Sequence, residues 1–127
     1  MEIVTEVNTE TALISKYENG IIRIQIKDDV HLNAKNLEDN YNVYLELMDG
    51  DDALFLILVN DSATISSDGR KEYNKKTRKE VRKKDALVIK NPATMLLINS
   101  QVKFIKPIIP IQAFLDERSA VAWLLKE

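Results

Sequence analysis

Few residues in this chain have side chains that could carry out catalysis or hold a metal ion. His31 is the only histidine and there is no cysteine, so the usual nitrogen and sulfur ligands of zinc are nearly absent. Carboxylates are dense at Asp28-Asp29 and within 49–52, but general acid/base catalysis needs a positioned pair with shifted pKa values, and neighbouring carboxylates in turns are usually solvated. Three glycines, each expected at a turn or a helix start, leave no phosphate-binding glycine loop. We therefore expect no catalytic residue, no metal, no cofactor and no enzymatic activity.

A second chemical feature is the positive charge concentrated between residues 70 and 84. This stretch holds half of the chain's 18 lysines and arginines, although the net charge of the whole chain is −2. Such a set could bind phosphates of a nucleic acid or of an anionic lipid surface, with an affinity that falls steeply as salt rises. The candidate anion-binding residues are Arg70, Lys71, Lys75, Arg78, Lys79 and Arg82.

The simpler interpretation of this stretch is a solvated helix face. Tyr73 is its only aromatic residue, and the isoelectric point near 5.5 is far below that of typical nucleic-acid-binding domains. The sequence therefore disfavours a nucleic acid as the partner, and leaves anion binding as an alternative role.

The composition is that of an ordinary folded domain. The chain has 127 residues, of which 45% are hydrophobic and 30% are charged, enough for one core without disulfides or a structural metal. The absence of cysteine agrees with a reducing compartment, and the acidic first residues do not resemble a secretory signal. We expect a single domain over residues 1–127, with no transmembrane segment and a cytoplasmic location.

The strongest fold signal is the apolar run Leu-Phe-Leu-Ile-Leu-Val at 54–59. It is too short to cross a membrane, and it lacks the alternation of a strand with one solvated face. A strand buried on both faces is usual where helices cross over a parallel sheet. This run therefore predicts an α/β fold.

A hairpin is predicted at the start of the sheet. Residues 12–17 and 21–27 flank Glu18-Asn19-Gly20, and Asn19-Gly20 is typical of a tight turn with two positive φ angles. Ile22, Ile24 and Ile26 alternate with polar residues, which predicts one inward and one solvated face.

Helices and strands then alternate along the rest of the chain. Asn33 is a cap for a helix that ends before Gly50, and Pro92 at a first helical position starts another that continues to about Phe104. The remaining predicted elements are one basic helix or two short ones broken near Lys76 over 66–84, a strand at 86–89, an edge strand at 107–111 and a terminal helix from Asp116.

The chain resembles the SpoIIAA-like family of small bacterial STAS/SEC14-type domains over essentially its whole length. The motifs that carry the resemblance are Glu18-Asn19-Gly20, His31-Leu32, Ile65-Ser66-x-Asp68-x-Arg70, and Phe104-x-Lys106-Pro107-x-x-Pro110 followed by Phe114, Asp116-Glu117, Ala120 and Trp123-Leu124.

This resemblance implies a STAS-like mixed sheet of about five strands that begins with the antiparallel hairpin, with about four helices packed against it. It also implies binding or regulation rather than turnover. The basic stretch departs from the family pattern, in which the second helix carries more alanine and leucine.

The resemblance further implies two candidate phospho-acceptors, Ser67 and Ser66. In STAS domains that antagonise anti-sigma factors, a serine in an Asp-Ser-Ser-Gly turn is phosphorylated, and Ser67 stands at the matching place, with Ser66 where that pattern has aspartate. A phosphate there would be stabilised by Arg70 and Lys71. The simpler interpretation is that the two serines cap a helix.

A small apolar ligand is the last implication, from the kinship to lipid-carrying SEC14 domains. Phe104, Phe114 and Trp123 are the candidate lining of an apolar groove, and packing in the core or in a dimer is the alternative. We expect a non-enzymatic, regulatory domain that binds a protein partner or a small apolar ligand, and that forms a homodimer through a sheet edge or a helix surface.

Overall fold

The computed structural model describes residues 2–75, 81–105 and 107–126. A six-stranded mixed sheet forms its centre, in the order β1-β2-β3-β5-β7-β8. Strands β1 to β3 pair antiparallel, and β3, β5, β7 and β8 pair parallel. The elements are β1 (Ile3–Asn8), β2 (Ala12–Tyr17), β3 (Ile22–Ile26), β4 (His31–Leu32), α1 (Ala34–Met48), β5 (Ala53–Leu58), β6 (Thr64–Ile65), α2 (Ser67–Tyr73), β7 (Arg82–Val88), α4 (Pro92–Ile105), β8 (Ile111–Phe114) and α5 (Glu117–Leu125).

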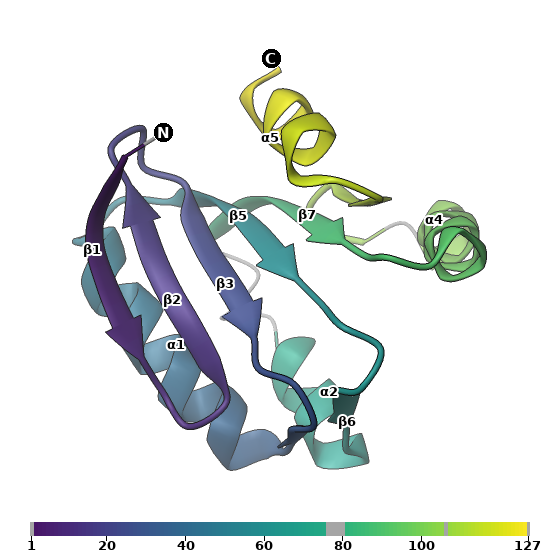
Figure 1. Ribbon diagram of the computed structural model, residues 1–127, viewed down its shortest axis with the longest axis horizontal. Coiled ribbons are helices and arrows are strands. Elements are labelled where there is room, and N and C mark those ends of the chain that lie inside the picture. Colours follow the sequence, from purple (N-terminus) through teal and green to yellow (C-terminus); the bar gives the residue numbers. More distant parts are fainter. Residues whose placement is uncertain (1, 76–80, 106, 127) are drawn as a thin grey trace.

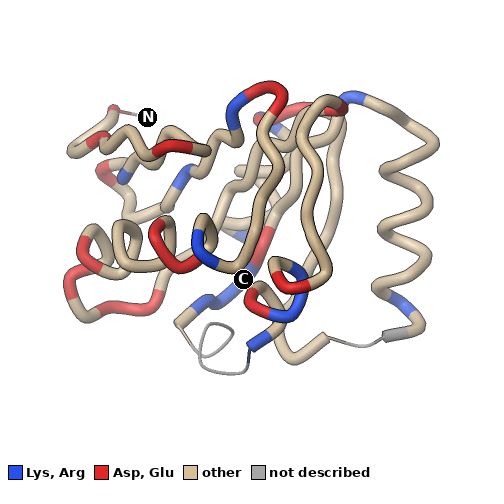
Figure 2. The backbone as a smooth tube through the Cα atoms, turned by 90° about the horizontal axis from the view of Figure 1, so that it is seen from below, with Lys and Arg blue, Asp and Glu red and all other residues tan. Residues whose placement is uncertain are grey.

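Helices cover the two faces of the sheet unequally. Helices α1 and α2 lie on one face, α5 lies on the other, and α4 stands beside the edge of the sheet next to β8 (Figure 1). Among the described residues of α4, Lys103 is the only charged one, and Figure 2 therefore shows most of this helix in tan. The face that carries α1 and α2 is covered by α1 mainly over β2 and β3.

Strand β5 is buried on both faces, as its apolar sequence predicts. Phe55 and Ile57 belong to the core beneath α1, whereas Leu56 packs with Ala120 and Leu124 of α5. Phe55 and Leu56 are both fully buried. The α/β architecture with its antiparallel start is confirmed, with six strands in the main sheet, one more than expected because β1 adds a strand outside the hairpin.

The hairpin forms between the predicted arms, but its turn is looser than predicted. Only Gly20 has a positive φ, of 89°, so Asn19 does not supply a second such angle. The amide of Tyr17 donates to the carbonyl of Ile21 at 3.0 Å, and that of Gly20 donates to the carbonyl of Tyr17 at 2.9 Å. These bonds enclose three residues, and a glycine at the last of them is a common solution for such loops.

The prediction of helix through residue 84 is wrong at its C-terminal end. Helix α2 ends at Tyr73, and β7 begins at Arg82, four residues before the predicted strand. The basic residues of β7 are divided between the two faces of the sheet by a shift in register after Arg82. Arg82 is buried with Asp85 on the α1 face, and Lys84 donates to the carbonyl of Trp123 of α5 at 3.1 Å. The break predicted near Lys76 lies outside the described residues.

The last strand is also displaced from its prediction. It runs over Ile111–Phe114 rather than 107–111, so the prolines precede the strand, where a missing amide donor breaks no ladder bond. Its predicted position at the sheet edge is confirmed.

Helix α4 covers that edge with one side chain. The Asn99 amide nitrogen donates to the carbonyl of Ala113 at 3.1 Å, and its amide oxygen accepts from the Ala113 amide at 2.7 Å. This pair imitates a neighbouring strand and satisfies the edge groups of a buried residue. Asn99 therefore fixes α4 to the rim of the sheet.

We predict that Asn99→Ala lowers the free energy of unfolding by about 1–3 kcal/mol, because two buried backbone groups lose their partners. Urea unfolding followed by circular dichroism measures this, with Ser100→Ala on the exposed side of the same helix as the control. Equal stability of the two variants would contradict the role given to Asn99.

Candidate functional site

An open cavity lies on the sheet between α1 and α2 on one side and α4 on the other. Its volume is about 600 Å³, and apolar side chains supply most of its wall. The floor begins with a row of three side chains in direct register, Ile24 of β3, Ile57 of β5 and Leu87 of β7. We call these three the central row.

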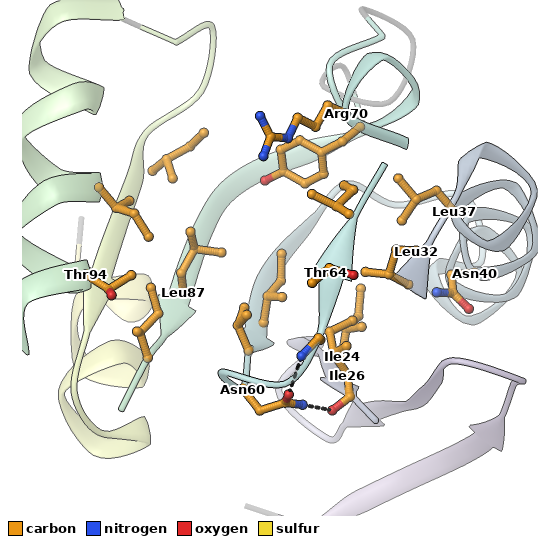
Figure 3. Close-up of a pocket in the computed structure, with 18 of the residues that line it drawn as sticks. Ile24, Ile26, Leu32, Leu37, Asn40, Asn60, Thr64, Arg70, Leu87 and Thr94 are labelled. Carbon is orange, nitrogen blue, oxygen red and sulfur yellow. Dashed lines mark hydrogen bonds between the residues drawn. The ribbon is translucent and has the colours of Figure 1, made fainter. Parts of the chain in front are cut away.

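The floor continues toward the carboxyl ends of the strands. Side chains of one face recur every second residue, so Ile26, Val59 and Ile89 follow the central row, and all three line the cavity. Leu37 of α1 and Ile98 of α4 belong to the opposing walls. Figure 3 shows side chains from both sides of the cavity pointing into this space.

The loop after β5 closes the carboxyl end of the cavity. The Asn60 side chain donates to the carbonyls of Ile26 and Lys27 at 3.0 and 3.1 Å and accepts from the amide of Ala63 at 2.9 Å. Figure 3 places Asn60 at one end of the cavity and Arg70 at the other. The side-chain amide of Asn60 thus connects the end of β3 with the loop that follows β5, and this fixes the geometry of the carboxyl end of the cavity.

The opposite end of the cavity is polar. Asp85 stands one row before Leu87, in register with Phe55, and is almost fully buried. Arg82 donates through Nη1 to Asp85 Oδ2 at 2.7 Å and through Nη2 to the Tyr44 hydroxyl at 3.0 Å. The Tyr73 hydroxyl donates to the same Asp85 oxygen at 2.7 Å. These residues connect α1, α2 and the sheet.

Three aromatic rings surround the guanidinium of Arg82. Its Cζ lies 4.7 Å from the ring centroid of Phe55, 5.1 Å from that of Tyr73 and 5.3 Å from that of Tyr44. Such faces attract a cation more strongly where water is excluded. We call these five residues, Tyr44, Phe55, Tyr73, Arg82 and Asp85, the arginine cluster.

The arginine cluster changes the titration of its members. Burial is the largest influence on the pKa of Arg82 and acts to lower it, but the charge of Asp85 together with the neighbouring Tyr44 and Tyr73 outweighs burial, and the pKa is raised. Burial, and then the charge of Asp85, raise the pKa of Tyr73. At neutral pH the cluster therefore holds a charged guanidinium and a neutral phenol.

The hydrogen bonding of the arginine cluster is incomplete. Within the described residues, Arg82 Nε and Asp85 Oδ1 are buried without a hydrogen-bond partner. A buried polar atom without a partner is costly. Arg82 also lines the cavity.

Ser66 and Ser67 lie at the start of α2, as the sequence predicts. Ser66 is the N-cap and accepts from the amide of Gly69 at 3.1 Å. Its hydroxyl donates to the carboxylate of Asp68, and this bond is the main cause of the lowered pKa of Asp68. Ser67 is exposed on the first turn, and its phosphorylation stays a prediction.

The candidate anion-binding residues do not form one surface within the described part of the chain. Lys71 is exposed, and Lys75 pairs with Glu72 at 2.6 Å. Arg82 is buried in the arginine cluster, and Arg78 and Lys79 lie outside the described residues. Anion binding by this set stays a prediction.

The three aromatic residues predicted to line a groove lie elsewhere. Phe114 and Trp123 pack together on the α5 face, with ring centroids 5.6 Å apart. Phe104 is 87% exposed on α4. The cavity is lined instead mainly by isoleucine, leucine and valine of the opposite face, whose alternation indicated burial but could not reveal the open space between α1 and α4.

The described residues offer no metal site and no membrane-spanning helix. Among the residues that the structure describes, no group of histidine and acidic side chains could hold a metal ion. No described helix is long and apolar enough to span a bilayer.

We predict that Tyr73→Phe lowers the free energy of unfolding by about 1–3 kcal/mol, because Asp85 loses a buried donor. Tyr17→Phe is the control for the loss of the hydrogen bond, because the Tyr17 hydroxyl has no hydrogen bond to a described residue, although burial also raises its pKa. Tyr73 ionises near pH 10 in the unfolded chain, but its pKa is raised in the folded protein. The free energy of unfolding should therefore fall as the pH rises above 10, and it should fall less in Tyr73→Phe, which lacks this phenol. Urea unfolding between pH 7 and 11 measures both effects, and an unchanged Tyr73→Phe would contradict the cluster.

The comparisons with known proteins establish the fold and the family. A search of curated proteins finds no match. A crystal structure of an uncharacterised protein of the DUF3478 family with a SpoIIAA-like fold, from Shewanella loihica PV-4, is similar with a TM-score of 0.66 and 15% identity over 98% of both chains. This confirms the SpoIIAA-like fold. A model described as domain of unknown function DUF7793 matches residues 15–127, and the chain belongs to that family.

Proposed function

We propose that this protein is a non-enzymatic binding domain that takes up a small, mainly apolar ligand in the cavity on the α1 face of the sheet. The observation that carries the proposal is the open cavity whose floor contains the central row, three apolar side chains in register. A concave, mainly apolar space of this kind is usual at ligand sites.

The dimensions of the cavity support this role. Its volume of about 600 Å³ lies within the range of roughly 300–1,000 Å³ that is typical of small-molecule sites. Apolar side chains supply most of its surface. Asn60 and Arg70 lie at its two ends, and the polar side chains of Asn40, Thr64 and Thr94 lie between them (Figure 3). A mainly apolar cavity with separate polar side chains suits a ligand held by burial and oriented by a few contacts.

The arginine cluster supports binding rather than catalysis. Asp85, its buried carboxylate, accepts from both Arg82 and Tyr73 through one oxygen. It is not among the described residues that line the cavity, whereas a general base must lie within hydrogen-bond reach of the proton that it takes from a ligand.

We predict that Leu87→Trp weakens binding of the neutral dye Nile red by at least roughly tenfold, because the larger side chain fills the centre of the floor. Leu125→Trp is the matched control, since Leu125 is 52% exposed on α5, across the sheet from the cavity. Fluorescence titration measures binding, and circular dichroism checks that both variants fold.

Unchanged binding by Leu87→Trp, or equal loss in both variants, would contradict this location of the ligand.

A further inference from the structure

The polarity of the cavity changes along the direction of the strands. The row that contains Phe55 and Asp85 is polar at β7, whereas the central row and the row after it are apolar. Successive rows are about 7 Å apart. A ligand that lies along the strands would therefore meet the charged groups of the polar row at one end and mainly hydrocarbon along the floor beyond that row.

Two arginines stand at the polar end. Arg70 and Tyr73 are one turn apart on α2 and face the same way, and both line the cavity. The guanidinium of Arg82 lies over the ring of Tyr73. The Tyr73 ring thus has one arginine against its face and another beside it on α2.

These arginines differ in how their charge is balanced. The charge of Arg82 is compensated by Asp85 at 2.7 Å, yet its Nε has no partner, although the side chain is only 7% exposed. Arg70 is exposed and forms no ion pair with a described residue. The polar end therefore offers an uncompensated positive charge and a buried donor without an acceptor.

The other end of the cavity has the opposite sign. Asp61 lines the cavity and follows Asn60, which Figure 3 places opposite Arg70. An anionic group is attracted to one end and repelled by the other, so the charges along the cavity favour a single orientation of a charged ligand.

We propose that the ligand is an amphiphile with one unbranched apolar tail and one anionic head, a carboxylate or a phosphate, whose head binds Arg70 and whose tail lies over the central row. This rests on the proposed function, since it names the chemistry of the ligand of the same cavity. The anionic oxygens accept from Arg70, a charge-assisted contact, at the end of the cavity that Arg82 also lines.

The test compares four probes that share one tail, namely decanoic acid, decyl phosphate, decanol and decylamine. Isothermal titration calorimetry below the micelle concentration should show that at least one anion binds roughly tenfold more tightly than decanol and decylamine. The acid and the phosphate separate the two sources of the anionic head.

Arg70→Gln should then weaken the preferred anion roughly tenfold and leave decanol unchanged. Lys71→Gln is the matched control, because it removes one charge from the same helix at a residue that does not line the cavity. It should bind all four probes as the unaltered protein does.

The outcomes separate the two proposals. Equal affinity for the acid, the phosphate and decanol, or a preferred anion that Arg70→Gln does not weaken, would overturn the anionic head alone. Failure of all four probes to bind would overturn the cavity as a ligand site as well. Self-association that fails in Leu87→Trp, without probe binding, would assign the apolar floor to a second copy of the chain and overturn both.

Discussion

The ion pair of Arg82 and Asp85 constrains the arrangement around it, because two charges buried in a sheet are stable only with close partners. Those partners come from three elements, Tyr44 of α1, Tyr73 of α2 and Phe55 of β5. Both helices are thereby held over the polar row, at the amino ends of the parallel strands. The next rows of the floor extend beyond their cover. The cavity therefore follows from where the charges are buried.

Helix α4 completes the cavity because it stops at the edge of the sheet. Asn99 occupies the backbone groups of Ala113 on β8, which holds the helix beside the rim instead of above the floor. Thr94 and Ile98 contribute to the wall from that position. On the opposite face of the sheet, Leu56 packs against Ala120 and Leu124 of α5.

The sequence predicted the elements whose signals are local. The apolar run at 54–59 identified the doubly buried strand, Asn33 capped α1, and the resemblance named the fold that the structural comparison confirms. The prediction from sequence failed at β7, because a run of basic residues favours a solvated helix unless a distant partner of one of them is known. The burial of Arg82 depends on Tyr44 and Phe55, which are far away in the sequence. The cavity was missed for a related reason, since periodicity indicates which side chains are apolar but not which of them a helix covers.

The most direct measurement is a methyl NMR titration of the isoleucine- and leucine-labelled protein with decanoic acid. The structure predicts chemical-shift changes at Ile24, Ile57 and Leu87, which share the floor of the cavity, and unchanged resonances for Leu124 beneath α5. Changes concentrated at Leu124, or confined to the exposed Leu96 and Leu97 of α4, would contradict the cavity as the binding site.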